Sequence, residues 1–546
     1  MFKVFWILSL ISSVLTNTIP ANDKGGFELH IVHLNDFHAR FEETSELAGV
    51  CKQNCIGGFS RVYTAIQQLK NENPDAIVLN AGDNFQGTLW YNIYKWNVTQ
   101  YFLNKLPTDA YTFGNHEFDD KIKGVVPFLD ALKAPTVAAN IDDSQEPDIQ
   151  GKYKKSVVIQ RGGKKIGVIG VLLSTTDEIT SSEKLKFLDE AESVNKEAER
   201  LVAEEKVDTI IVLSHCGYDL DQEIARKASP KIGLIVGAHS HTFLYTGSDL
   251  PGIDKPAGPY PTIINHSDGR RILVVQASAY AKYLGNISVS YDGDGNVESW
   301  RGAPIYLNKS VPQDKKINEE IAVWKEGVDD FGKEVLGKTK VLLDQRSCRT
   351  SECNLGDFVA DSMVYAHLDT DEEDAWTSAA IAITNAGSLR ASIEIGDITF
   401  NDLVTTQPFE NTFDIGELQG KYIEEFLEFA TTSFYNYRER FDINLLQISG
   451  IRVVYNLTNP EGSRTQSIKI RCRECAVPVY EPLHHDKMYK IVVNSFLAGG
   501  GDGYKVIADN LKNKKIGPRD IDVLRKYIEL HSPIIQPLDG RIQIVT

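Results

Sequence analysis

The chain has 546 residues, of which 42% are hydrophobic and 24% are charged, and this composition excludes a disordered or fibrous protein. Lys and Arg number 58 against 75 for Asp and Glu, so the formal net charge is −17. Such an acidic chain is not drawn to nucleic acid by its overall field, and an anionic substrate would need a local cationic site of metal ions or arginines. The length predicts three or four domains, or two larger lobes.

The chain begins with an apolar run, residues 4–15, behind a single cation at Lys3. This pattern is typical of a secretory signal peptide and is too short to cross a bilayer. We expect residues 1–18 to be removed, with cleavage between Thr16 and Ala21; the alternative is a buried N-terminal strand or helix. Residues 540–546 lack the hydrophobic tail of a lipid-anchor signal. We therefore expect a secreted, extracellular protein without a membrane anchor.

Six of the seven cysteines form three close pairs, which in an exported chain predict local disulfides. The pairs are Cys51 with Cys55, Cys348 with Cys353, and Cys472 with Cys475. A zinc ribbon would need a second Cys-x-x-Cys pair. Cys216 remains, and we expect it to be a buried, unreactive thiol. Asn-x-Ser/Thr patterns make five positions candidates for glycosylation: Asn97, Asn265, Asn286, Asn308 and Asn456.

Apolar runs alternate with amphipathic stretches over the first three hundred residues. The predicted strands are 27–34, 76–80, 210–214, 234–236 and 272–276, and the predicted helices include 58–71 and 188–205. This alternation indicates an α/β architecture.

The pattern changes near residue 311. Apolar residues recur at spacings of 4, 3, 4, 3 and 4, which predicts an amphipathic helix ending near Gly337. They are Ile317, Ile321, Trp324, Val328, Phe331 and Val335. We interpret 311–338 as a linker helix between a domain at 19–310 and a domain at 339–546. The second domain is again mixed, with a predicted helix near 421–435.

Residues of metal-ligand type follow several predicted strands of the first domain. They are Asp36 and His38, Asp83, Asn115 and His116, His215, and the pair His239 and His241. Because the carboxyl ends of strands form the ligand site of α/β sheets, we expect these side chains to converge at one sheet edge, where Gly82, Gly114 and Gly237 permit tight turns. Each pattern alone is common by chance, but five in order are not. Carboxylate, amide and imidazole ligands suit two divalent ions bridged by one carboxylate.

These residues resemble the calcineurin-like metallophosphoesterases, and from about residue 27 to residue 545 the chain is similar to the 5′-nucleotidase family. The most specific stretches are HLNDFHARFEETSE, NAGDNFQGTLWY, GNHEFD, GAHSHTFLYTG, CRTSECNLGDFVADSM and NSFLAGGGDGY. The resemblance implies a two-lobed α/β fold. An N-terminal metallophosphoesterase α/β sandwich would be joined by a helix to a C-terminal α/β nucleotide-binding domain.

The resemblance also implies the ligand sets of the two metals. One metal would be held by Asp36, His38 and Asp83, and the other by Asp83 as a bridge with Asn115, His215 and His239. Vertebrate members of the family have Asn where this chain has His241, but the wider superfamily uses such a second His as a ligand. We expect His241 to bind the first metal; the alternative is a hydrogen-bonding neighbour. Zinc is the expected metal, with Mn, Fe, Co, Ca or Mg as alternatives.

The remaining site residues follow from the same resemblance. His116 would be the catalytic histidine, oriented by Asp119. Nucleotide contacts would come from Arg40 beside the metals, Arg349, Asn385 and Arg390 near the phosphates, Phe409 and Phe496 on the two faces of the base, and Asp502 on the ribose. The further disulfide of the vertebrate enzyme is absent, because Ala360 and Ala382 occupy its positions. Asn385-Ala-Gly-Ser-Leu-Arg390 replaces a glycine-richer segment of that enzyme. Lobe rotation about the linker helix would then join base and phosphate sites.

These observations predict a metal-dependent nucleotide phosphohydrolase. We expect apyrase-type hydrolysis of ATP and ADP to AMP and phosphate, as in the secreted salivary apyrases of the family, which would deplete the ADP that recruits platelets. The alternative is a 5′-nucleotidase that converts AMP to adenosine. A secreted receptor-binding protein without catalysis is disfavoured because no core ligand position is damaged. A general phosphomonoesterase or cyclic-nucleotide phosphodiesterase is disfavoured by the two base-stacking phenylalanines. We expect a monomer or homodimer.

Overall fold

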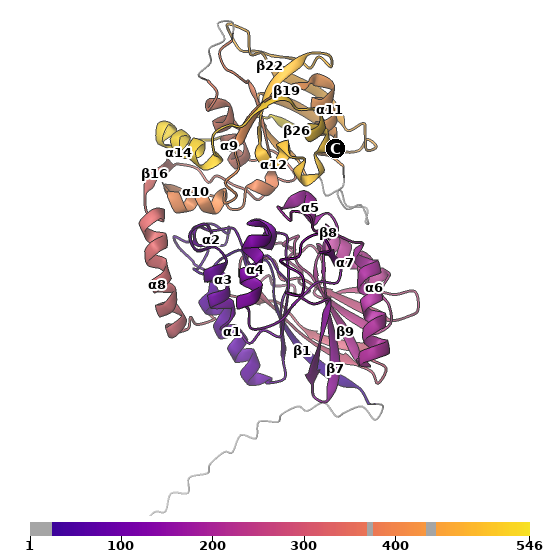
Figure 1. The fold of residues 1–546 in the computed structure, drawn as a ribbon. Helices are drawn as coiled ribbons and strands as arrows, with labels where there is room; N and C mark the ends of the chain where they lie inside the picture. The colour runs from indigo at the N-terminus through magenta and orange to yellow at the C-terminus, as the bar shows by residue number, and fades with distance from the viewer. Residues whose placement is uncertain (1–24, 369–374, 433–443, 546) are drawn as a thin grey trace, which may run out of the picture.

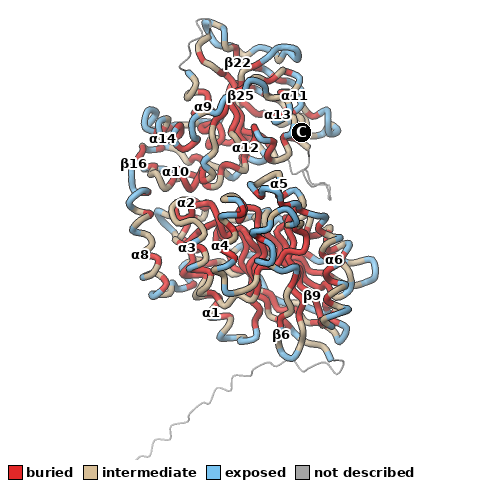
Figure 2. Tube along the Cα trace, viewed as in Figure 1, coloured by how far each residue is buried: buried red, intermediate tan, exposed pale blue. Residues whose placement is uncertain are grey.

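The computed structural model describes residues 25–368, 375–432 and 444–545 (Figure 1). The predicted signal peptide lies outside this part of the chain. Two α/β lobes follow one another in sequence, the N-terminal lobe in indigo to magenta and the C-terminal lobe in orange to yellow, as the prediction had them. Buried residues form the interior of both lobes (Figure 2). Within the described residues, no helix combines the length and the hydropathy of a membrane span.

The N-terminal lobe contains two large sheets. In the first sheet the strand order is β14-β13-β1-β2-β3-β4, with β15 paired to β13. Its strands are β1 (Phe27–Leu34), β2 (Ile77–Asn80), β3 (Ala110–Thr112), β4 (Thr136–Val137), β13 (Tyr283–Tyr291), β14 (Val297–Gly302) and β15 (Ile305–Tyr306). Strands β1 to β4 are parallel, whereas β13 returns antiparallel to β1. The carboxyl ends of β1 to β4 therefore lie at the same edge of the sheet.

In the second sheet the order is β11-β12-β10-β9-β7-β6, and β7, β9, β10 and β12 are parallel. Its strands are β6 (Ser156–Arg161), β7 (Lys164–Leu172), β9 (Thr209–His215), β10 (Ile232–Val236), β11 (Thr262–Asn265) and β12 (Arg271–Val275). Strand β9 is apolar along Ile210–Leu213 because both of its faces are buried. A minor pair joins β5 (Ile141–Asp142) to β8 (Lys186–Phe187).

The two sheets pack face to face, and helices cover their outer faces. Ile31 and Leu79 of the first sheet share one core with Leu213 and Val236 of the second. Helices α1 (Phe59–Glu72), α2 (Leu89–Tyr94), α3 (Trp96–Leu103) and α4 (Lys121–Ala131) pack beside the first sheet, and α6 (Glu190–Arg200) and α7 (Tyr218–Arg226) beside the second. The α/β sandwich that the family resemblance implied is confirmed, with four layers. The ligand loops come from both sheets of the sandwich and not from the edge of a single sheet, as the strand pattern alone had suggested.

The C-terminal lobe has a five-stranded sheet in the order β20-β17-β24-β19-β25 and a four-stranded sheet in the order β23-β22-β21-β26. The strands are β17 (Ile381–Asn385), β19 (Phe413–Gln419), β20 (Leu446–Ser449), β21 (Ile451–Asn456), β22 (Thr465–Arg471), β23 (Tyr480–Pro482), β24 (Met488–Asn494), β25 (Lys512–Lys515) and β26 (Ile542–Val545). The helices are α9 (Asn354–Tyr365), α10 (Phe400–Thr406), α11 (Gly420–Phe429), α12 (Ser495–Ala498), α13 (Lys505–Asn510) and α14 (Asp520–His531).

Helix α8 (Lys315–Gly332) lies along one side of the molecule between the lobes (Figure 1). It begins at Asp314, whose carboxylate accepts the backbone N–H of Ile317. The predicted end at Gly337 is wrong, because Val335 begins strand β16 (Val335–Thr339), which pairs with β18 (Gly396–Thr399). The apolar spacing that predicted the longer helix included two residues that are not buried, because Phe331 is 63% exposed and Val335 is 54% exposed.

Other predicted boundaries shift by a few residues. The helix predicted at 188–205 begins at Glu190 and changes to a wider π turn, η2 (Leu201–Glu205). The helix predicted near 421–435 ends at Phe429, and residues 433–435 lie outside the described chain. All three predicted disulfides are confirmed, and Cys216 is buried and unpaired.

Candidate active site

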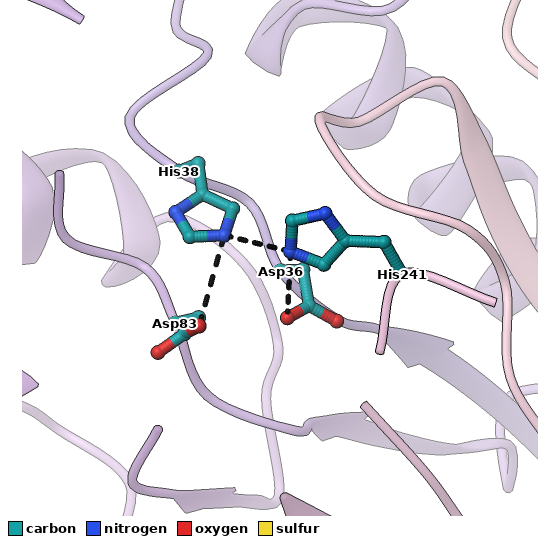
Figure 3. A group of neighbouring side chains, drawn as sticks. All are labelled: Asp36, His38, Asp83 and His241. Carbon is teal, nitrogen blue, oxygen red and sulfur yellow. Dashed lines mark hydrogen bonds and ion pairs between the residues drawn. The ribbon is translucent and has the colours of Figure 1, made fainter. Parts of the chain in front are cut away.

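The predicted metal ligands lie together at the carboxyl ends of the central strands. Two groups of side chains have ligand atoms within 4.8 Å of one another, and Asp83 belongs to both. The first group is Asp36, His38, Asp83 and His241, and the second is Asp83, His215 and His239 (Figure 3 shows the first). Loops after β1, β2 and β10 and the end of β9 supply them, so both sheets contribute. Asn115, after β3, reaches the second group, with Oδ1 at 3.0 Å from His239 Nδ1.

The backbone of these loops is strained. Asp36, His38, Asp83, His239 and His241 all have positive φ, between 48° and 72°. This left-handed conformation costs an L-residue about 1–2 kcal/mol, and such strain concentrates at functional sites. The loops after β2 and β3 also pack closely, because a Cβ built at Gly82 would clash with the amide nitrogen of Gly114.

The geometry of the ligand atoms fits divalent cations. In the first group, Nε2 of His38 and Nε2 of His241 face each other at 3.1 Å, and the latter lies 3.4 Å from Asp36 Oδ1. In the second group, Nε2 of His215 is buried, and its near neighbour is Asp83 Oδ2 at 3.1 Å. Converging imidazole nitrogens and carboxylates are the donor set that two metals sharing Asp83 require.

Neighbouring groups fix the orientation of the histidines. The Nδ1 atoms of His38 and His215 lie 3.2 Å and 2.6 Å from the carbonyl oxygens of Phe85 and Ala81. Each Nε2 is thereby left to act as the ligand atom. Burial lowers the pKa of His239 to about 3, which keeps this imidazole in the neutral form that metals bind.

His116 and Asp119 form the predicted dyad. Nδ1 of His116 lies 2.8 Å from Asp119 Oδ2, and its backbone N–H donates to Asp83 Oδ1 at 3.0 Å. Burial opposes protonation of His116, but the Asp119 and Asp83 carboxylates outweigh this effect and raise its pKa. The imidazole is therefore held beside the metal ligands in a state that favours carrying a proton.

Glu117 links two of the ligand loops, and the sequence analysis did not identify it. Its carboxylate accepts the backbone N–H groups of Asp83 at 3.0 Å, Asn84 at 2.7 Å and Gly114 at 2.5 Å. It thus joins the loop after β2 to the loop after β3. The signal in the sequence was its place in the Gly-Asn-His-Glu stretch. The sequence does not show that this side chain accepts hydrogen bonds from backbone N–H groups.

Residues of the C-terminal lobe reach the ligand groups. Arg390 Nη2 lies 3.1 Å from His38 Nε2, and the ring of Phe409 stacks on His116 with centroids 5.3 Å apart. The structure therefore brings Arg390 and Phe409 together with the predicted metal centre.

Asn385 and Asp502 are also adjacent. Asn385 Nδ2 donates to Asp502 Oδ2 at 2.9 Å. Gly387 lies beside them, and a Cβ built there would be 3.9 Å from Arg349 Nη2. The ring of Phe496 covers Gly501. The sandwich of the base between Phe409 and Phe496 stays a prediction.

Arg40 is placed differently from the other predicted substrate contacts. It is 3% exposed, and its guanidinium donates to the carbonyl oxygens of His38, Gly87 and Ala48 while stacking on Tyr280. These contacts indicate that Arg40 holds the ligand loops in place, and a contact with substrate stays a prediction.

Comparison with known proteins agrees with this geometry. Residues 29–243 match the calcineurin-like phosphoesterase model, and residues 335–509 match the C-terminal domain of 5′-nucleotidases. An apyrase from Tabanus yao is 48% identical over the full length of both chains, and a 5′-nucleotidase from Homo sapiens is 38% identical over 96% of this chain and 92% of its own.

Among solved structures, a 5′-nucleotidase precursor from Thermus thermophilus superposes with a TM-score of 0.86 at 32% identity, covering 95% of this chain and 99% of its own. The chain therefore belongs to the 5′-nucleotidase family of calcineurin-like phosphoesterases and is a phosphoester hydrolase whose fold implies a dinuclear divalent-metal site.

Proposed function

We propose that the protein is a secreted apyrase that hydrolyses ATP and ADP to AMP and phosphate, with a pair of zinc ions as the expected metals. The observation that carries nucleotide hydrolysis is the contact between lobes: Arg390 lies against His38, and Phe409 stacks on His116. A phosphoryl group at the ligand groups would meet a guanidinium, and the rest of the nucleotide would extend toward the C-terminal lobe. The Tabanus yao relative supports the choice of ATP and ADP, because it is an apyrase.

Two cations bound by the ligand groups would supply Lewis-acid chemistry, by lowering the pKa of water and offsetting phosphoryl charge. The residues of the chain would do the rest. Arg390 would hold phosphoryl oxygens through its planar fork of N–H groups. His116, oriented by Asp119, would stabilise the transferring group and donate a proton to the leaving oxygen.

The nucleoside would be held by the C-terminal lobe. Phe409 and Phe496 would stack on the base, a contact worth about 1–3 kcal/mol per base that tolerates different bases. Asp502, fixed by Asn385, would accept hydrogen bonds from the ribose hydroxyls. Arg349 would contribute a second cation near the phosphates.

Hydrolysis of AMP to adenosine is the second candidate. The human and Thermus thermophilus relatives are 5′-nucleotidases, and the predicted site residues are common to both activities. The two candidates differ in the leaving group, which is a phosphate oxygen for ADP and the ribose oxygen for AMP.

Export of the protein is supported by its three disulfides, which persist in oxidising compartments. In a fluid that mixes with blood, removal of ADP would inhibit ADP-driven platelet aggregation. A receptor-binding protein without catalysis is disfavoured, because the predicted ligands Asp36, Asp83 and His215 are intact and converge.

The test is phosphate release from ATP, ADP and AMP in parallel, each with and without a chelator. We expect release from ATP and ADP that stops at AMP and is abolished by chelation. Hydrolysis of AMP alone would refute the apyrase proposal in favour of the 5′-nucleotidase. Absence of release from all three nucleotides, by a metal-loaded protein, would refute both.

A further inference from the structure

Asp119 uses both of its carboxylate oxygens, and only one of them contacts His116. Oδ2 lies 2.8 Å from His116 Nδ1, whereas Oδ1 accepts a hydrogen bond from the Thr180 hydroxyl at 2.8 Å. His116, Asp119 and Thr180 thus form a chain of two hydrogen bonds that ends outside the loop carrying the dyad. Hydrogen bonds at both oxygens restrain the carboxylate in the orientation that faces the imidazole.

Thr180 is itself held in place from two sides. It directly follows the short helix α5 (Thr176–Ile179), which is anchored to the end of β7 by the Thr176 hydroxyl and the carbonyl of Leu173, 2.6 Å apart. The other side of α5 packs against η4 (Gly501–Gly503) of the C-terminal lobe. Here Glu178 pairs with Lys505 at 2.8 Å. This ion pair is exposed and contributes little stability by itself, so it fixes α5 only while the lobes are in contact.

We infer that Thr180 is a positioning residue for the reaction: its hydroxyl fixes Asp119, and through Asp119 it fixes the His116 imidazole beside the metal ligands. Among the described residues, the Thr180 side chain donates a hydrogen bond to Asp119 and to none of the metal-ligand groups, so it acts through the dyad. The inference rests on the proposed catalytic role of His116, but not on which nucleotide is the substrate.

The central variant is Thr180→Val, which removes the hydroxyl and keeps the shape of the side chain. Since one hydrogen bond orients the carboxylate, we expect kcat to fall about 3- to 10-fold with KM unchanged. Thr180→Ser restores the hydroxyl and should recover most of the rate. The matched control is Thr175→Val, the same change at the exposed residue that directly precedes α5.

A double-mutant cycle separates positioning from a general disturbance of the fold. If Thr180 acts through Asp119, then Thr180→Val should cause no further loss of kcat in an Asp119→Ala background. If Thr180→Val fails to fold, Thr180→Ala carries the same cycle, because it places no added apolar group at this half-buried position. Multiplicative losses in the cycle, an unchanged kcat for Thr180→Val, or failure of Thr180→Ser to recover the rate would each overturn the inference.

The rates should be measured on p-nitrophenyl phosphate as well as on the nucleotides. This chromogenic ester needs no base or ribose recognition. Loss of rate on the ester in Thr180→Val supports the inference even if wild-type protein leaves ATP and ADP intact, a result that would refute only the proposed function.

Discussion

The Glu117 carboxylate holds two ligand loops together, and replacing it with glutamine tests how far the metal centre depends on that link. In the structure Oε2 accepts from Asp83 and Gly114, and Oε1 accepts from Asn84. A glutamine in its best orientation keeps the first two bonds, but its NH2 group then faces the N–H of Asn84. One hydrogen bond to a charged acceptor is lost and a buried N–H is left unpaired, so we expect Glu117→Gln to lower the free energy of unfolding by about 2–4 kcal/mol.

The same change should weaken metal binding, because the lost bond to Asn84 loosens the loop directly after the shared ligand Asp83. Residues that orient ligands typically affect metal affinity by about 10- to 100-fold, and we expect a loss in this range for Glu117→Gln. The assay is competition for zinc with a chromogenic chelator, together with the thermal midpoint of the metal-loaded protein. Glu199→Gln, at an exposed position of α6, is the control for loss of a carboxylate. Unchanged metal affinity with an unchanged midpoint would refute the reasoning.

Three further outcomes are expected. His116→Ala should reduce turnover by about 10²- to 10⁴-fold while both metals stay bound, as measured by kinetics and metal analysis; retained turnover would remove His116 from the mechanism. His241→Ala should lose the metal of the first group and keep the other, and a preparation that still binds both would show that His241 is only a neighbour. Asp357 is fully buried, and burial raises its pKa to about 8. Between about pH 4 and pH 8 this carboxyl is therefore protonated in the folded state and ionised in the unfolded state. Its contribution to the free energy of unfolding falls as pH rises through this range. The thermal midpoint of Asp357→Asn, relative to wild type, should therefore rise between pH 5 and pH 8, and a difference independent of pH would contradict this pKa.

Local sequence was sufficient wherever the neighbours along the chain decide the structure. Strand β1 matches its predicted bounds because its apolar residues lie against both helix and sheet layers, and the strands that precede Asp83 and His215 were placed to within about a residue or two for the same reason. The convergence of the candidate ligand residues also followed from the sequence, because five such patterns in order, each after a strand, are hard to explain as chance. Family resemblance added the two-lobed arrangement.

Tertiary structure decided what depends on contacts between distant segments. Periodicity continued through Val335, but pairing of β16 with β18 ended helix α8 at Gly332. The sandwich, rather than one sheet edge, brings His215 from the second sheet to Asp83 of the first. The sequence also did not show which groups these side chains contact: Glu117 accepts hydrogen bonds from backbone N–H groups, and Arg40 donates to carbonyl oxygens. A pattern in sequence records which residues are buried or polar, whereas the partner of each polar group is fixed only when the chain is packed.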